Sequence, residues 1–232
     1  ILEGGSPGRE KVCVMAVQKD KINTLIEILS AAKLKPVRIV PDFVALFNLL
    51  EGTKHDFISN TDRTSLMVVD IGSEATKVFV NKDGEIKMQR LAPVGGNDLN
   101  DVVQRLQNME YEEAENYKYN LELKEDNTDE EKEEIFNEVG ELIDELNSQI
   151  KRSIDYYKMQ EGIMAIDEMI ISGGSTLLKG YKDILEKKLG VVVHRFPTSR
   201  LLVKKMNNIN EIESNLCRYD AAIGNIIEEV SK

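Results

Sequence analysis

The chain has little of several features that would mark a particular class of protein. Among its 232 residues there is no tryptophan, there are two cysteines and five prolines, and no apolar run approaches the roughly 18 residues that span a bilayer. Basic residues are also scarce, because 30 lysines and arginines stand against 41 acidic residues and the net charge is −11. Nucleic-acid binding needs a basic surface, so this charge argues against it, and equally against adsorption to anionic lipid.

The cysteines predict neither a disulfide framework nor a metal site. Cys13 and Cys217 lie in apolar or amphipathic sequence without metal-ligand spacing, so each is predicted to be a buried free thiol. Free thiols favour a reducing cytoplasm. The acidic residues gather between positions 110 and 145, and a charge run of this kind is typical of a solvated helix face.

Two strand endings rich in glycine are the most informative features present. The first runs Leu66-Met-Val-Val-Asp70-Ile-Gly72-Ser-Glu-Ala-Thr76, and the second runs Met169-Ile-Ile-Ser-Gly173-Gly174-Ser175. Each is a short, β-branched apolar run that stops at small residues, which is the pattern of a buried strand entering a tight turn. Asp70 with Gly72 predicts a backbone anion cradle beside a carboxylate, and that combination suggests a phosphate with Mg²⁺ between them.

Each signal also has an ordinary interpretation. Asp-x-Gly is commonly just a turn, and Gly-Gly after a strand is scarcely more specific. The order of the two endings, together with Gly95-Gly96 and the segment Ala114-Glu115-Asn-Tyr-Lys118, favours the functional interpretation.

Four blocks in this order resemble the actin-like ATPase superfamily, and within it the PilM family of type IV pilus assembly proteins more closely than the FtsA family. The blocks are Val69-Asp-Ile-Gly-Ser-Glu-Ala-Thr-Lys77, Pro93-Val-Gly-Gly-Asn-Asp-Leu99, Glu112-Glu-Ala-Glu-Asn-Tyr-Lys118 and Ile171-Ser-Gly-Gly-Ser-Thr-Leu-Leu-Lys-Gly180. The resemblance implies an α/β, ribonuclease H-like fold that binds ATP and Mg²⁺.

The resemblance also implies a role for each block. Asp70 would hold Mg²⁺ through water, and the second phosphate motif would contact phosphate through Gly72, Ser73, Thr76 and Lys77. Gly95 and Gly96 belong to the segment that follows it. Glu115 and Lys118 would reach the ribose and base, with a surface ion pair as the alternative. The adenosine would lie against Gly173, Gly174 and Ser175.

The chain departs from the resembled family at its start, because no first phosphate motif precedes Val12. We therefore expect a fragment with weak or absent ATP binding. Residues 1–11 are predicted to be a linker or cloning remnant, with a native loop as the alternative. Residues 12–62 would be the C-terminal part of the first domain with part of its partner-binding subdomain, and residues 63–232 a complete second domain.

Hydrophobic periodicity predicts a series of strands and helices. The expected strands are 12–17, 37–40, 66–70, 76–81, 85–93, 168–172 and 191–195, and the expected helices are 19–33, 42–50, 97–107, 111–119, 135–157, 176–189 and 220–230. We expect Pro36 to end the first helix, a domain boundary within 51–63, a hairpin turn at 82–84 and a loop at 120–128. Small residues in the last helix predict a close helix contact.

Two functional classes remain open. One is a cytoplasmic ATP-binding scaffold of the type IV pilus platform that binds the N-terminal peptide of a PilN-like inner-membrane protein. The other is an active ATPase, either an FtsA-like cell-division protein or a kinase or chaperone-like enzyme of the same superfamily. No Ser-His-Asp or Cys-His arrangement stands out, so we expect slow or absent turnover. Apolar side chains, including Phe43, Phe47, Ile223 and Ile227, are predicted to be uncovered and to promote self-association.

Overall fold

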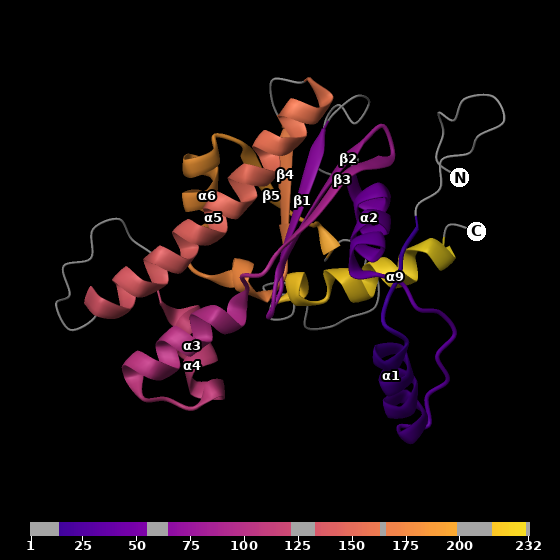
Figure 1. Cartoon of the computed structure of the whole chain (residues 1–232), viewed down its shortest axis with the longest axis horizontal. Coiled ribbons are helices and arrows are strands. Elements are labelled where there is room, and N and C mark those ends of the chain that lie inside the picture. Colours follow the sequence, from indigo (N-terminus) through magenta and orange to yellow (C-terminus); the bar gives the residue numbers. More distant parts are fainter. Residues whose placement is uncertain (1–13, 55–64, 122–132, 163–165, 199–214, 231–232) are drawn as a thin grey trace. The chain divides into compact units, whose positions relative to one another are not determined.

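The computed structural model describes residues 14–54, 65–121, 133–162, 166–198 and 215–230 (Figure 1). The chain divides into two compact units, Ile1–Pro41 and Asp42–Lys232. The division precedes the helix at 42–53, whereas the predicted boundary lay within 51–63. The predicted linker at 1–11 and the predicted loop from residue 122 onward fall outside the described residues.

The helix in the described residues of the first unit, 14–41, is α1 (Lys19–Ala31), which buries no residue. The predicted strands at 12–17 and 37–40 are wrong, because residues 14–18 and 34–41 form no strand in the described part of the chain. A strand needs a neighbour to accept its backbone hydrogen bonds, and periodicity alone cannot supply one. Helix α1 ends before Pro36, where Lys33 adopts a left-handed conformation (φ 58°) and Leu34 N–H donates to Leu29 O at 2.8 Å.

The second unit is built on a five-stranded mixed sheet of order β3-β2-β1-β4-β5 (Figure 1). Strands β1 (Leu66–Ile71), β2 (Thr76–Lys82) and β3 (Glu85–Ala92) form an antiparallel meander. Strands β4 (Glu168–Ser172) and β5 (Val192–Arg195) run parallel to β1. Asp83 and Gly84 both have positive φ, which confirms the predicted hairpin turn.

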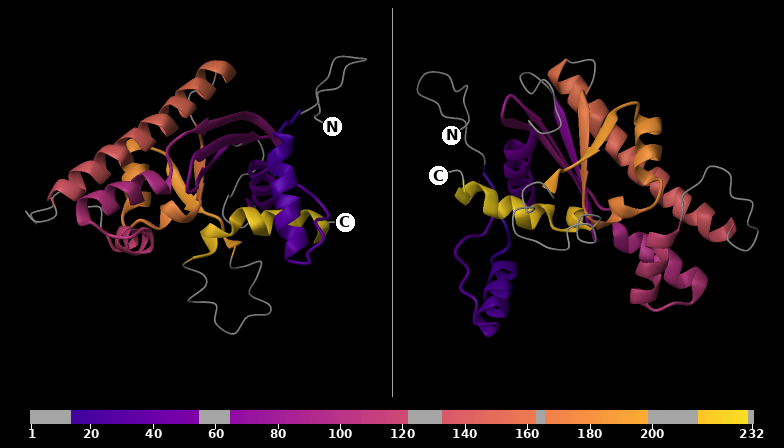
Figure 2. Two further views of the ribbon diagram at one scale, coloured as in Figure 1. Left: turned by 60° about the horizontal axis from the view of Figure 1, so that its bottom comes forward. Right: turned by 180° about the vertical axis from the view of Figure 1, so that it is seen from behind.

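Helices cover both faces of this sheet (Figure 2). One face packs against α5 (Glu133–Glu161) and α6 (Tyr181–Leu189), and the same core extends from α5 to α3 (Gly96–Gln107) and from there to α4 (Tyr111–Asn120). The predicted apolar stripe of α5 is confirmed, since its buried apolar side chains are Ile135, Val139, Ile143, Leu146, Ile150, Ile154 and Tyr157. The other face packs against α2 (Asp42–Thr53) and α9 (Asp220–Val230).

Helices α2 and α9 pack closely, as the small residues of the last helix predict. A Cβ on Gly224 would lie 1.9 Å from Ala45 O, so only glycine fits at this contact. The prediction that apolar side chains of these helices are uncovered is wrong. They are partly buried against the hydrophobic core between α2, α9 and the sheet, and they are Phe43, Phe47, Ile223 and Ile227.

The predicted helix 176–189 begins later than expected. Thr176 lies in a 3₁₀ helix, η3 (Gly174–Leu177), and α6 starts at Tyr181 after the left-handed Gly180 (φ 83°). A second 3₁₀ helix, η4 (Leu216–Arg218), precedes α9. Both 3₁₀ helices lie at the carboxyl ends of β1 and β4, where the glycine-rich turns meet.

Candidate functional site

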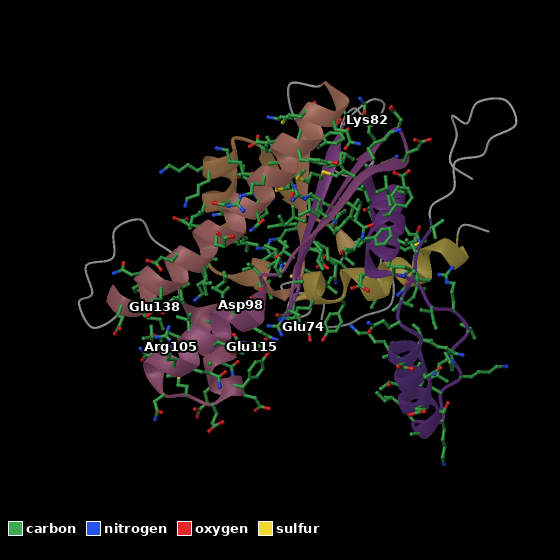
Figure 3. All side chains as sticks on the ribbon, in the orientation of Figure 1. Glu74, Lys82, Asp98, Arg105, Glu115 and Glu138 are labelled. Atoms are coloured by element: carbon green, nitrogen blue, oxygen red, sulfur yellow. The ribbon has the colours of Figure 1, made fainter. Side chains whose placement is uncertain are left out.

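A cavity of about 290 Å³ opens at this end of the sheet. Of the residues predicted to bind nucleotide, all line it except Thr76, Lys77 and Gly95. Figure 3 places Glu74, in the turn after β1, at the same end of the molecule as Glu115 and Asp98. The lining residues are Asp70, Gly72, Ser73, Gly96, Asn97, Asn100, Tyr111, Glu115, Lys118, Tyr119, Ser172, Gly173, Gly174, Ser175, Cys217, Arg218 and Ala221.

The turn after β1 is bound to the start of α3 through its backbone. Gly96 N–H donates to Gly72 O at 2.9 Å, and Asn97 N–H donates to Ser73 O at 2.8 Å. A Cβ on Gly95 would lie 2.5 Å from Ser73 O, so Gly95 serves this close approach beneath the cavity. The N–H of Gly72 donates to Ala75 O at 3.1 Å, so it closes the turn and does not contribute to the predicted anion cradle.

Thr76 and Lys77 do not line the cavity, and their side chains make other contacts. The Thr76 hydroxyl donates to Val94 O at 2.8 Å. The Lys77 ammonium contacts the Asp42 carboxylate and lies 3.5 Å from Asp70 Oδ2. The structure therefore does not bring these two side chains together with the other predicted phosphate contacts.

Asp70 is a buried carboxylate at the carboxyl end of β1, 8% exposed. Burial raises its pKa above the ordinary value, and Lys77 acts in the opposite direction. A Cβ on Gly173, whose φ is +90°, would lie 2.8 Å from Asp70 Oδ1 and 2.3 Å from Ile71 O. The glycine at this position thus keeps the second turn close against the Asp70 carboxylate.

Helix α4 supplies a buried cation to the cavity. Lys118 is 2% exposed, and its ammonium donates to Gly96 O at 3.2 Å. Burial lowers the pKa of Lys118 to about 8, opposed by the nearby Glu115 carboxylate. The alternative of a surface ion pair with Glu115 does not hold, because Lys118 is buried.

Tyr119 and Arg218 form a cavity wall that the sequence did not predict. The Arg218 guanidinium lies 4.6 Å from the centroid of the Tyr119 ring, and the Lys118 ammonium lies 5.1 Å from the same centroid. Glu115 accepts a hydrogen bond from the Tyr119 hydroxyl at 3.2 Å and lies 3.9 Å from Arg218. Arg218 follows no recognisable motif and is far from α4 in sequence, so only the fold reveals this contact.

A buried carboxylate that the sequence did not predict lies next to the cavity lining, in contact with Ser172. The Asp220 carboxylate, at the start of α9, accepts hydrogen bonds from Ser172 Oγ at 2.9 Å and Thr198 Oγ1 at 2.7 Å. Burial raises the pKa of Asp220 to about 6, and the two hydroxyl groups oppose that rise. Cys217 is a buried free thiol, as predicted, while Cys13 lies outside the described residues.

These groups together suit a nucleotide. An aromatic ring with stacked cations offers a surface for a planar base, a buried ammonium beside glycine turns suits phosphate or ribose oxygens, and Asp70 suits a hydrated divalent cation. The described residues contain no cluster of three or more His, Cys, Asp or Glu that would hold a metal by itself. A cation at Asp70 would therefore need further oxygen ligands from water and phosphate.

Comparison with known protein families shows which family this chain belongs to. Residues 3–229 match the family described as "Type IV pilus assembly protein PilM". The chain belongs to the PilM family. Its fold is that of the actin-like ATPases, as the resemblance implied.

Solved structures similar to this PilM-family chain support the same fold. The PilM-PilN type IV pilus biogenesis complex matches with a TM-score of 0.72 at 20% identity, covering 90% of this chain and 57% of that chain. MreB 5 of Spiroplasma citri bound to AMPPNP matches with a TM-score of 0.59 at 14% identity, covering 93% and 66%. EutJ from Carboxydothermus hydrogenoformans matches with a TM-score of 0.55 at 24% identity, covering 78% and 57%.

The PilM-family chain thus spans just over half the length of the PilM in that complex. In the part of the chain that the structure describes, no helix combines the length and apolarity needed to cross a bilayer.

Proposed function

We propose that this chain binds ATP with Mg²⁺ in the cavity at the carboxyl ends of β1 and β4. The observation that carries the proposal is Lys118, a cation buried to 98% beside the glycine turns, whose ammonium donates a hydrogen bond to the carbonyl of Gly96. A buried ammonium with donors to spare is costly unless an anion or polar ligand completes its hydrogen bonding. MreB 5 of Spiroplasma citri, which shares this fold, is bound to AMPPNP in its structure.

Three groups of residues would contact three parts of the proposed ligand, namely the cation, the phosphates and the nucleoside. Asp70 holds hydrated Mg²⁺, which would neutralise phosphate charge when bound. Gly72, Ser73 and Gly96 line the phosphate side, and Gly173, Gly174 and Ser175 let the adenosine approach the backbone. Lys118 and Glu115 contact the ribose and base edge, while Tyr119 and Arg218 pack against the base.

An NMR titration of the full chain with Mg-ATP tests this proposal, because chemical shifts detect binding even at millimolar affinity. We expect shifts at the amides of Gly72, Gly96 and Gly173, and a loss of most of the affinity in Arg218→Ala. Arg105→Ala is the matched control, since Arg105 also pairs with a glutamate, Glu138, but lies on α3 away from the cavity lining (Figure 3). Shifts located elsewhere, or equal losses in both variants, would contradict the site.

We further propose that the chain acts as a scaffold of type IV pilus assembly. In this role it binds the N-terminal cytoplasmic peptide of a PilN-like inner-membrane protein, at the cytoplasmic face of the membrane and beside other pilus components. The PilM of the related structure is in a complex with PilN. The first unit offers apolar side chains for such a peptide, with Val14 83%, Val37 85% and Ile39 56% exposed.

Binding of a fluorescently labelled PilN-like N-terminal peptide tests the scaffold role. Val37→Lys should weaken peptide binding at least tenfold, because a charge would replace apolar contact area. Val192→Lys is the control, since Val192 is also an exposed valine, 56%, but lies on β5 of the second unit. Equal binding by both variants would show that the peptide does not use residues around Val37.

A further inference from the structure

Lys77 lies between two carboxylates that belong to different elements. On β2 it stands opposite Asp70 in the antiparallel register with β1. Its ammonium contacts the carboxylate of Asp42, the first residue of α2, and lies 3.5 Å from Asp70 Oδ2. We call Asp42, Lys77 and Asp70 the Lys77 bridge.

The Lys77 bridge runs from the cavity to the protein surface. The side chain of Asp70 is 12% exposed, that of Lys77 is 29% exposed and that of Asp42 is 54% exposed. Asp70 lines the cavity, whereas Lys77 and Asp42 do not. Lys77 can therefore act on a ligand in the cavity only through Asp70.

We infer that the Lys77 bridge couples cation occupancy at Asp70 to the start of α2. This inference rests on the proposed function, which places a divalent cation beside Asp70. One ammonium is shared by two carboxylates, and a divalent cation at Asp70 would repel the ammonium towards Asp42. Linkage is reciprocal, so a change that holds Lys77 at Asp70 must weaken cation binding by the same factor.

The position of Asp42 in the chain connects this coupling to the first unit. Asp42 is the first residue of the second unit and directly follows Pro41, the last residue of the first unit. The unit that we propose to bind the partner peptide is thus joined to the nucleotide-binding unit at the bridge. Occupancy of the cavity would reach the partner-binding unit through the covalent connection at residues 41–42.

Lys77→Gln is the first test, with Mn²⁺ added in the presence of ATP as the probe, so that phosphate can supply the further oxygen ligands, and with paramagnetic broadening of the Gly72 amide signal as the readout. Removing the competing ammonium should raise the apparent Mn²⁺ affinity roughly three- to fivefold, the size expected for a partly exposed ion pair. Lys77→Arg, which keeps the charge, should retain the wild-type affinity. A phosphate-binding role for Lys77 predicts instead that Lys77→Gln weakens Mg-ATP binding.

Lys82→Gln is the matched charge control. Lys82 is the last residue of β2, five residues and about 16 Å along the strand from Lys77, at the opposite end of the sheet from Glu74 (Figure 3). It should leave the Mn²⁺ affinity unchanged, because screening removes interactions beyond about 10 Å between exposed charges.

A double-mutant cycle separates sharing of the ammonium from simple charge effects. In the wild-type background, Asp42→Asn should lower the Mn²⁺ affinity roughly threefold, because Lys77 then turns fully to Asp70. In the Lys77→Gln background the same change should have little effect. Equal effects in the two backgrounds would overturn the inference.

The remaining outcomes distinguish the inference from the proposed function. If Asp70→Asn leaves the Mn²⁺ broadening of Gly72 unchanged, the cation does not bind at Asp70 and the proposed site is wrong. If broadening requires Asp70 but the affinity is the same in Lys77→Gln, the site stands and the coupling is wrong. Mg²⁺ should also shift the Asp42 amide signal in the wild type and not in Lys77→Gln.

Discussion

At the scale of single residues, the cavity contains a cation that the fold holds at a cost in stability. Lys118 is buried to 98%, and its ammonium bonds to one backbone carbonyl. Desolvation disfavours the charged form, which is why its pKa falls to about 8 from the ordinary 10.5. A residue that lowers stability at neutral pH while facing a cavity is typical of a binding site.

The pH dependence of stability follows from this shift. Between about pH 8 and 10.5 the unfolded chain binds more protons at Lys118 than the folded chain does. The contribution of Lys118 to the free energy of unfolding therefore rises with pH in this window and is constant below it. Urea unfolding at several pH values should show this rise in the wild type and its absence in Lys118→Met.

The same substitution should separate stability from binding. At pH 7 we expect Lys118→Met to raise the free energy of unfolding by about 2 kcal/mol, since the cost of burying the charge exceeds the loss of one hydrogen bond. Mg-ATP binding should fall at the same time. A variant that is both less stable and weaker in binding would indicate that Lys118 is structural.

At the scale of elements, the contact between α2 and α9 depends on one glycine, Gly224, which has no side chain. Gly224 lets the α9 backbone approach Ala45 O within the space that a Cβ would need. Glycine in a helix interior is normally unfavourable, and here the close packing over the second core offsets that cost. The register between the two helices is set by this contact.

Two glycine-to-alanine substitutions test this interpretation. Gly224→Ala should lower the free energy of unfolding by about 3 kcal/mol or more, because the backbone of α2 must move away. Gly140→Ala, in the middle of α5, should raise it by about 0.5–1 kcal/mol, since nothing lies within 4 Å of its added Cβ. Thermal unfolding followed by circular dichroism measures both, and equal signs would contradict the proposed contact.

At the scale of the whole molecule, the two units differ in how they are stabilised. The second unit has two hydrophobic cores, one on each face of the sheet. The helix of the first unit buries no residue. Stability should therefore reside in residues 42–232, and the first unit should serve for contacts with other molecules.

Removal of residues 1–41 tests this division. We expect the shortened chain to unfold at the same urea midpoint as the full chain, to lose binding of the PilN-like peptide and to remain monomeric in light scattering at high concentration. The full chain should self-associate through its exposed apolar side chains, and added peptide should reverse this. A large fall in the midpoint would show that the first unit contributes to the core.

Most of the second unit could be predicted from the sequence, because its elements carry strong periodicity. The strands around Asp70 and Ser172, the stripe of α5 and the turn at Asp83 each follow from local patterns. The strands expected at 12–17 and 37–40 are absent where the structure describes the chain, since β-branched residues indicate an extended chain but not its pairing partner.

The sequence by itself determined the family, the order of the strands and main helices of the second unit, and the glycine turns that line the cavity. These properties depend on neighbouring residues, where local sterics and periodicity act directly. The tertiary structure alone decided that Arg218 packs against Tyr119, that Lys118 is buried, and that Lys77 joins Asp70 to Asp42 instead of lining the cavity. Such contacts depend on how distant elements pack, and desolvation and charge pairing act only once that packing has formed.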